Sequence, residues 1–267
     1  MDKYKLIAID MDDTLLNNRL EITERSLQAV RRVREKGIHV TLSTGRMFCS
    51  AYPYAMQLGI DLPLITYQGA LVKNALSGEV LAHKTIPLEL ARQVVADVQK
   101  CGYHINVYTD DKLYVEKVTP VGLDYARICG VDLNPVGDLV AFLQQPPTKI
   151  VVISTESQID DLKGIMEPIY RDRLHVCKSK PTFLEFSHPK ATKGYALAKL
   201  AELFNVQQHE VMAIGDSDND VEMLEYAGMA VVMANARDHI KTLADYITDS
   251  NEEDGVAKVL EKLVLAD

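Results

Sequence analysis

The sequence predicts an α/β protein with a Rossmann-like parallel sheet as its core and a second α/β domain inserted into that core. At both ends of the chain, short apolar runs alternate with segments of helical periodicity, the usual order of a parallel sheet covered by helices. In the middle third, this alternation gives way to stretches that resemble antiparallel hairpins. Acidic and hydroxyl residues follow several predicted strands, where open α/β sheets bind their ligands.

The N-terminal segments predict a strand, a helix and a second strand. Lys5–Ile9 is a compact apolar run without helical period, as expected for a strand that is buried on both faces. Thr23 can cap a helix that runs to Lys36, and Gly37 is placed to end it. Ile38–Leu42 then predicts the next strand. Two strands joined by one helix imply a right-handed parallel crossover.

The same alternation continues to residue 83 and resumes after the middle of the chain. We predict a helix over Met47–Leu58 and a strand near Ile65 before the interruption. Residues 1–83 and 189–267 are therefore expected to share one sheet. The second of these parts predicts a helix over Gly194–Phe204, a strand over Val211–Ile214, a helix near Asp220–Tyr226 and a strand over Ala230–Met233.

Residues 84–188 have a different pattern and are predicted to form the inserted domain. Leu88–Lys100 has helical spacing, and Ile105–Lys117 alternates around two aspartates as a hairpin does. The remaining predicted elements are a strand over Thr148–Ser154, a helix over Gln158–Ile169 and strands over Leu174–Lys178 and Phe183–Phe186.

Composition and charge exclude several classes of protein. With 47% hydrophobic and 25% charged residues, the 267-residue chain has the composition of a globular protein with a substantial core. A formal net charge of -9 argues against nucleic acid as a partner, because such binding needs clustered Lys and Arg. The four cysteines lack the CxxC spacing of zinc or redox sites. The N-terminal segment fits neither a signal peptide nor a membrane span, so we expect a cytoplasmic location and no membrane partner.

The first chemical motif is Asp10-Met11-Asp12-Asp13-Thr14, at the end of the first predicted strand. If the strand stays extended, Asp10 and Asp12 point the same way and two carboxylates meet at one site. Such a pair is costly unless a cation or a proton separates the charges, which suggests a metal ion and an acid/base role together. Taken alone, the motif is equally well explained as a solvated turn.

Two further motifs are suited to binding an anion. Ser43-Thr44-Gly45-Arg46 closes the second strand and offers a hydroxyl and a backbone N–H to a phosphate oxygen. Thr192-Lys193-Gly194 opens a helix and places an ammonium beside its N-terminus. A plain strand-to-helix turn and a solvated lysine are the alternatives for each motif in isolation.

The fourth motif, Gly215-Asp216-Ser217-Asp218-Asn219-Asp220, follows a buried strand and is the most specific. Its alternating acids resemble the start of an EF-hand loop. That alternative fails because Val221 stands at the position of the required glycine and Ala227 at that of the bidentate glutamate. Mg²⁺ remains suitable, since it often binds through one or two carboxylates together with substrate phosphate.

In this order and at strand ends, the four segments resemble the four motifs of the haloacid dehalogenase superfamily. The long insertion between the second and third motifs is similar to that of the Cof-type sugar-phosphatase branch, whose inserted α/β domain is a cap. The resemblance implies a Mg²⁺-dependent phosphatase that acts on a small-molecule phosphate ester, such as a sugar phosphate or a related phosphomonoester.

The resemblance also implies a role for each motif residue. Asp10 would attack phosphorus and form an aspartyl-phosphate, and Asp12 would act as the general acid and base. The Mg²⁺ ligands would be the Asp10 carboxylate, the Asp12 backbone carbonyl and Asp216, with Asp220 behind them. The phosphate would contact the Met11 backbone, Thr44, Gly45, Lys193 and Asn219.

Two positions depart from the usual pattern of this branch. Asp13 replaces a common glycine, and because Asp tolerates a left-handed turn we expect the mechanism to be kept. Gln68 replaces a common asparagine, so the substrate details of the branch are not carried over to this chain.

Three other functions are compatible with part of this pattern. A signalling receiver domain is about half as long, and its phosphoacceptor position here holds Thr66-Tyr67-Gln68 without a carboxylate. A catalytically silent sensor of phosphorylated metabolites is disfavoured by the intact motifs. A phosphomutase of related architecture would share every motif, and it stays open at this point.

Overall fold

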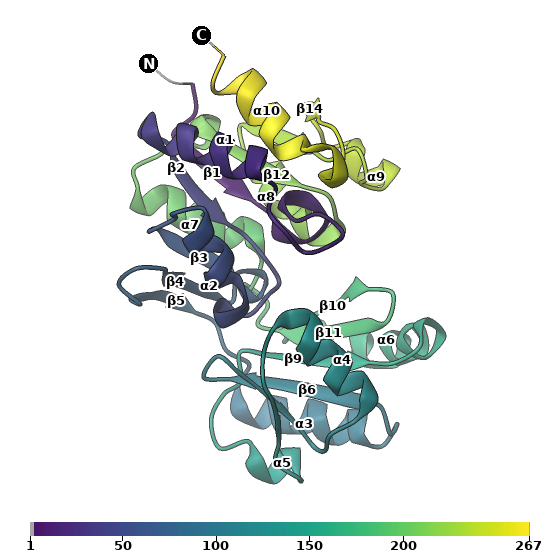
Figure 1. Cartoon of the computed structure of the whole chain (residues 1–267). Helices are drawn as coiled ribbons and strands as arrows, with labels where there is room; N and C mark the ends of the chain where they lie inside the picture. Colours follow the sequence, from purple (N-terminus) through teal and green to yellow (C-terminus); the bar gives the residue numbers. More distant parts are fainter. Residues whose placement is uncertain (1–2, 267) are drawn as a thin grey trace. The chain divides into compact units, whose positions relative to one another are not determined.

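A computed structural model describes residues 3–266 of the chain and divides into two compact units (Figure 1). The core unit comprises the residues up to Gly45, Ala51–Leu81 and the residues from Thr192 onward. The cap unit comprises Arg46–Ser50 and Ala82–Ala191. One unit is built on a parallel sheet and the other is a separate α/β domain, so the predicted fold class is confirmed.

The core sheet has five parallel strands, each short and almost wholly apolar. Ile9 pairs with Leu42 on one side and with Ile214 on the other, and all three side chains are buried. Burial on both faces explains why these strands lack polar alternation. Their order is β14 (Tyr246–Ile247), β13 (Met229–Val232), β12 (Val211–Gly215), β1 (Leu6–Ile9) and β2 (His39–Leu42).

The chain leaves β1 and β12 in opposite directions, which creates a switch point between them. Helix α1 (Glu24–Glu35) connects β1 to β2, and α8 (Val221–Tyr226) connects β12 to β13. Parallel crossovers are right-handed as a rule, and helices that leave neighbouring strands in opposite directions then cover opposite faces of the sheet. Helix α10 (Gly255–Leu263) packs on α1, and α7 (Lys193–Leu203) packs on α8. Ligands bind at such a switch point in open α/β sheets.

Helix α1 illustrates how the local sequence specifies an element. Thr23 accepts a hydrogen bond from the Ser26 N–H and so caps the first turn, as predicted. Ala29, Val30 and Val33 lie at helical spacing and are buried, so this face holds the helix on the sheet.

A small antiparallel sheet extends the core beyond β2. Ser43 bridges to Ile65, which lies in β3, and β3 pairs with β4. The outer strands were not predicted, because β5 is largely exposed and carries no pattern of burial. The elements of this region are α2 (Phe48–Gln57), β3 (Pro63–Thr66), the 3₁₀ turn η2 (Tyr67–Gly69), β4 (Leu71–Asn74) and β5 (Val80–His83).

The cap unit contains a six-stranded sheet with one apolar face and one face that carries polar and charged side chains. The apolar face packs on three helices, α3 (Leu88–Gln99), α5 (Leu139–Phe142) and α6 (Glu156–Tyr170). The other face carries Asn106, Tyr108, Lys149 and Glu185, all buried, and Lys149 and Glu185 form an ion pair of 3.1 Å. The strand order is β10 (His175–Lys180), β11 (Phe183–Ser187), β9 (Lys149–Ile153), β6 (His104–Thr109), β7 (Lys112–Val115) and β8 (Leu133–Pro135).

The predicted hairpin in this unit is present as β6 and β7. Asp110 and Asp111 form its turn, both at positive φ, which aspartate tolerates better than most residues. Helix α4 (Pro120–Cys129) was missed, because Val121, Leu123 and Ile128 are exposed and do not form a buried stripe.

The remaining elements are short and lie in the core unit. They are the turn η1 (Met11–Leu15), η3 (Gln208–Glu210), η4 (Asp218–Asp220), α9 (Asp238–Lys241) and η5 (Asn251–Glu253). Between residues 3 and 266, no helix has both the length and the apolar character that a membrane crossing requires.

Candidate active site

The candidate site lies at the carboxyl ends of β1 and β12, where the sheet has its switch point. Asp10 directly follows β1, and its N–H donates to the Ile214 carbonyl at 2.9 Å. Asp216 follows β12 in the neighbouring position. Parallel pairing of the two strands therefore brings together acids that are about 200 residues apart in sequence.

Lys193 connects two of the acids through a fully buried ammonium. It is the first residue of α7, whose N-cap Thr192 accepts from the Tyr195 N–H. The Lys193 Nζ lies 2.5 Å from Asp10 Oδ1 and 2.6 Å from Asp220 Oδ1. Burial alone would lower the pKa of Lys193, but the two carboxylates together raise it above its usual value. The ammonium is therefore charged.

Asp220 organises the loop after β12 with its second oxygen. Its Oδ2 accepts from the N–H groups of Asp216 at 3.0 Å and Ser217 at 3.1 Å. A Cβ at Gly215 would lie 2.7 Å from the Asp220 Cγ, so only glycine permits this approach. Both Asp220 oxygens are thus engaged by the protein, and the side chain orients its neighbours.

Three carboxylates converge beside the single ammonium. Asp10, Asp216 and Asp220 each offer an oxygen within 4.8 Å of the others, and Thr14 Oγ1 donates to Asp216 Oδ1 at 2.8 Å. Burial, followed by the charge of Asp220, raises the pKa of Asp216 to about 7 and raises that of Asp10 well above its usual value. With all three ionised, the charge would exceed that of Lys193 by two units. The cluster could therefore hold a divalent metal ion, and its oxygen donors suit a hard one.

The turn after Asp10 differs from the prediction. The strand ends at Ile9, and Met11–Leu15 forms a wide turn that the Leu16 N–H closes on the Met11 carbonyl at 2.9 Å. Asp13 has a φ of 61°, so the chain reverses after Asp12. The strand therefore does not continue through Asp12, which was the condition for aligning the Asp10 and Asp12 side chains, and the Asp12 carboxylate is not among the three that cluster.

The Thr44–Gly45 loop packs against η2 and forms a hydrogen bond with it. Thr44 is buried, and its carbonyl accepts from the Gln68 N–H at 3.0 Å. Gln68 has a φ of 59°, and its carboxamide packs on Gly45 so closely that a Cβ there would lie 2.5 Å from the Gln68 Nε2. Gln68, one of the two departures from the family pattern, thus supports the backbone that is expected to bind phosphate.

Two predicted phosphate contacts lie on the same loops. Met11 is buried directly after Asp10. Asn219 is half-buried in η4, where its Oδ1 accepts from Ser217 Oγ at 2.8 Å. Sequence reasoning assigned no role to Thr14 or Asn235. Thr14 lies inside the first motif, whereas Asn235 donates to the Asp13 carbonyl at 2.8 Å from a segment without any motif signal.

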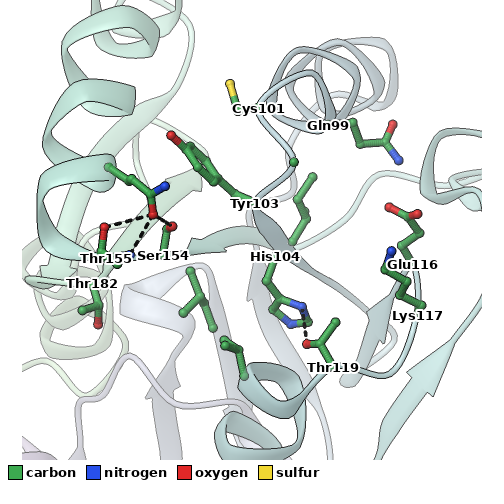
Figure 2. A pocket seen from close by; sticks show the side chains of 15 residues that line it. Gln99, Cys101, Tyr103, His104, Glu116, Lys117, Thr119, Ser154, Thr155 and Thr182 are labelled. Carbon is green, nitrogen blue, oxygen red and sulfur yellow. Dashed lines mark hydrogen bonds between the residues drawn. The ribbon is translucent and has the colours of Figure 1, made fainter.

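A cavity of about 890 Å³ lies within the cap unit and contains none of the predicted site residues (Figure 2). Its polar side chains bond to one another: His104 to Thr119, and Ser154 and Thr155 to Gln158. The cavity is therefore not the candidate active site.

Comparison with known proteins gives a consistent result. A sequence profile described as haloacid dehalogenase-like hydrolase matches residues 7–260. Phosphatase YwpJ of Bacillus subtilis is 31% identical, over 97% of this chain and 100% of its own. The 5-amino-6-(5-phospho-D-ribitylamino)uracil phosphatase YcsE of the same organism is also 31% identical, over 98% and 96%. A crystal structure of a haloacid dehalogenase-like hydrolase from Bacteroides thetaiotaomicron has 29% identity and a TM-score of 0.91, over 97% and 99%.

The Lys193 contacts lead to a prediction about stability. Lys193→Met keeps the apolar stem but leaves Asp10 and Asp220 buried without their cation. Breaking a buried ion pair costs about 3–5 kcal/mol, and we expect the free energy of unfolding to fall by that amount. Urea titration in EDTA measures it. Lys199→Met, which removes an exposed partner of Glu202, is the control and should change stability little. Equal stability of the two variants would contradict the structural importance of the buried pairs.

Proposed function

The chain belongs to the family of haloacid dehalogenase-like hydrolases, and from that premise we propose that it hydrolyses small phosphomonoesters with Mg²⁺ through an aspartyl-phosphate on Asp10. The enzyme class follows from the relatives. They are named phosphatases, and this chain matches them along almost their whole length. The observation that carries the proposal is the buried contact of Lys193 with Asp10, next to Asp216.

The first chemical step uses Asp10 as nucleophile. A carboxylate oxygen of Asp10 forms a bond to phosphorus while the bond from phosphorus to the ester oxygen breaks. Lys193 supports the ionised form of Asp10 against burial, because its ammonium lies 2.5 Å from the carboxylate. In the same step, Asp12 gives its proton to the departing alkoxide.

The second step regenerates the enzyme. Asp12, now ionised, takes a proton from water, and the water oxygen attacks phosphorus. The bond between phosphorus and Asp10 breaks, and inorganic phosphate leaves. Asp12 suits both steps because it is partly exposed and stands two residues from the nucleophile, outside the cluster of buried carboxylates.

The phosphoryl oxygens would be bound by groups that the fold already holds in place. These are the backbone of Met11, the Thr44 hydroxyl, the Gly45 N–H, the Lys193 ammonium and Asn219. Preorganised donors of this kind supply most of the stabilisation in phosphoryl transfer.

The residues that would hold Mg²⁺ are Asp10, Asp216 and the Asp12 backbone carbonyl, with Asp220 orienting the Asp216 loop. When bound, the ion supplies positive charge that offsets the carboxylates and the transferring phosphoryl group. The donor set fits, because three carboxylates face one ammonium and all ligands are oxygens.

The proposed substrate is a small phosphorylated metabolite, such as a sugar phosphate or a related ester. YcsE is named for a phosphate ester on a ribityl chain, which is a sugar alcohol. The net charge of -9 disfavours a nucleic acid substrate. A phosphate-release screen over sugar, nucleotide and cofactor phosphates with Mg²⁺ tests the proposal.

Metal dependence is the first prediction from this proposal. Phosphate release should stop in EDTA and return when Mg²⁺ is added in excess. The reason is that the three clustered carboxylates, when ionised, exceed the charge of Lys193 by two units and need a further countercharge. A colorimetric phosphate assay on p-nitrophenyl phosphate and on the best sugar phosphate measures both. Undiminished turnover after thorough chelation would show that the metal proposal is wrong.

Asp10→Asn is expected to lower turnover by at least about 10³-fold, because the amide keeps the shape but is a poor nucleophile. Mass spectrometry of the quenched wild-type enzyme should detect a phosphorylated Asp10, which the variant lacks. Asp238→Asn changes a fully exposed carboxylate and serves as the control. Wild-type turnover by Asp10→Asn would refute covalent catalysis at this residue.

Asp12→Asn removes proton transfer while keeping a hydrogen-bonding side chain. We expect a loss of about 10² to 10⁴-fold on a sugar phosphate. The loss in the phosphorylation step on p-nitrophenyl phosphate should be smaller, because that leaving group needs little protonation. Single-turnover rates on both esters measure the difference. Equal losses would mean that Asp12 acts through geometry or metal binding.

A further inference from the structure

The turn that carries Asp12 is held by a segment more than 200 residues away in sequence. Asn235 Nδ2 donates to the Asp13 carbonyl at 2.8 Å. Asn235 Oδ1 accepts from the Asn251 N–H at 3.1 Å. The Asn235 carboxamide therefore connects the turn to η5, using its N–H as donor to the turn and its oxygen as acceptor from η5.

Asn251 makes a second connection to the same turn. Its Nδ2 donates to the Leu16 carbonyl at 2.9 Å, and the side chain is buried. Leu16 closes the turn through its own N–H, which donates to the Met11 carbonyl. The two asparagines thus donate to the carbonyls of Asp13, within the turn, and of Leu16, at its end.

The chain after the turn is fastened to the same segment. Glu252 accepts from the Asn18 N–H at 2.6 Å, and Asp254 accepts from Thr23 Oγ1 at 2.6 Å. Beyond these bonds, Arg25 of α1 pairs with Glu261 of α10 at 2.6 Å. The segment that carries the asparagines is therefore itself anchored on the helix that follows the turn.

The turn needs such support because of its backbone. Asp13 is held at a φ of 61°, a left-handed conformation that is less favourable for a residue with a side chain than for glycine. Asp13 is exposed, so packing of its own side chain does not hold it there. The direction of the preceding Asp12 side chain depends on this reversal.

We propose that Asn235 and Asn251 are positioning residues that hold the Asp12–Asp13 turn, and thereby direct the Asp12 carboxyl toward the leaving oxygen. This inference rests on the proposed phosphatase function for its catalytic part. Neither asparagine touches the substrate in this scheme, and both act through the backbone of the turn. A small misplacement of a catalytic group is enough to reduce turnover strongly.

Isosteric variants separate this role from general stability. Asn235→Asp keeps the acceptor for Asn251 but cannot donate to the Asp13 carbonyl. Asn251→Asp keeps its backbone N–H but cannot donate to Leu16. Glu253→Ala is the matched control, because Glu253 also lies in η5 and its carboxylate accepts from Ser250 Oγ, away from the turn.

The experiment compares two esters and measures amide exchange on the full-length protein. We expect Asn235→Asp and Asn251→Asp to lower turnover of the best sugar phosphate by roughly 10 to 100-fold, and that of p-nitrophenyl phosphate by less than about 3-fold. Hydrogen exchange of the amides from Asp13 to Asn17 should become faster, while that of β1 stays unchanged. Glu253→Ala should match the wild type in all of these measurements.

Equal losses on both esters, or unchanged turnover on both, would overturn the inference. So would exchange that speeds up throughout the core unit, because that result indicates general destabilisation. If the wild-type protein hydrolyses no ester, the proposed function fails, and the exchange measurement still decides whether the two asparagines hold the turn. Unchanged exchange in both variants would then overturn the inference as well.

Discussion

The buried ammonium of Lys193 is the interaction on which the rest of the site depends. It contacts Asp10 and Asp220, which come from opposite ends of the chain, and neither carboxylate is exposed to water. Burying three carboxylates together without a cation would be prohibitive. One ammonium reduces that cost without cancelling it, and the excess negative charge leaves the site suited to a divalent ion. The stability of the fold and the proposed chemistry therefore depend on the same charged side chains.

The site is assembled from short loops at strand ends, and each loop is held by groups outside the motifs. Asp220 accepts a hydrogen bond from the loop after β12, and the Gln68 side chain packs on Gly45. Asn235 holds the turn after β1. The sheet supplies the positions of the motifs, because parallel strands end at one edge. The supporting side chains then determine the direction in which each reactive group points, which a strand end alone leaves open.

Most of the fold could be predicted where burial leaves a pattern in the sequence. The core strands β1, β2, β12 and β13, which are largely buried on both faces, give apolar runs, and the helix after Thr23 combines a cap with a buried stripe. Elements without such a pattern were missed, as β5 and α4 show, since their apolar residues lie in solvent. The chain after Ile9 was expected to stay extended, but it forms a wide turn. The turn is closed locally by the Leu16 N–H on the Met11 carbonyl and is bonded to Asn235 and Asn251, which are distant in sequence.

The sequence by itself determined the residue types of the site and their order along the chain, and through them the family, because acids, hydroxyls and a lysine at the ends of predicted strands already define a phosphate and metal chemistry. Tertiary structure decided which of these groups meet. It placed Lys193 between two acids, kept the Asp12 carboxylate out of the cluster and used Asn235 to hold a turn 222 residues earlier. The physical reason is that local sequence encodes burial and backbone preference, whereas contacts between distant loops depend on how the whole sheet is paired and packed.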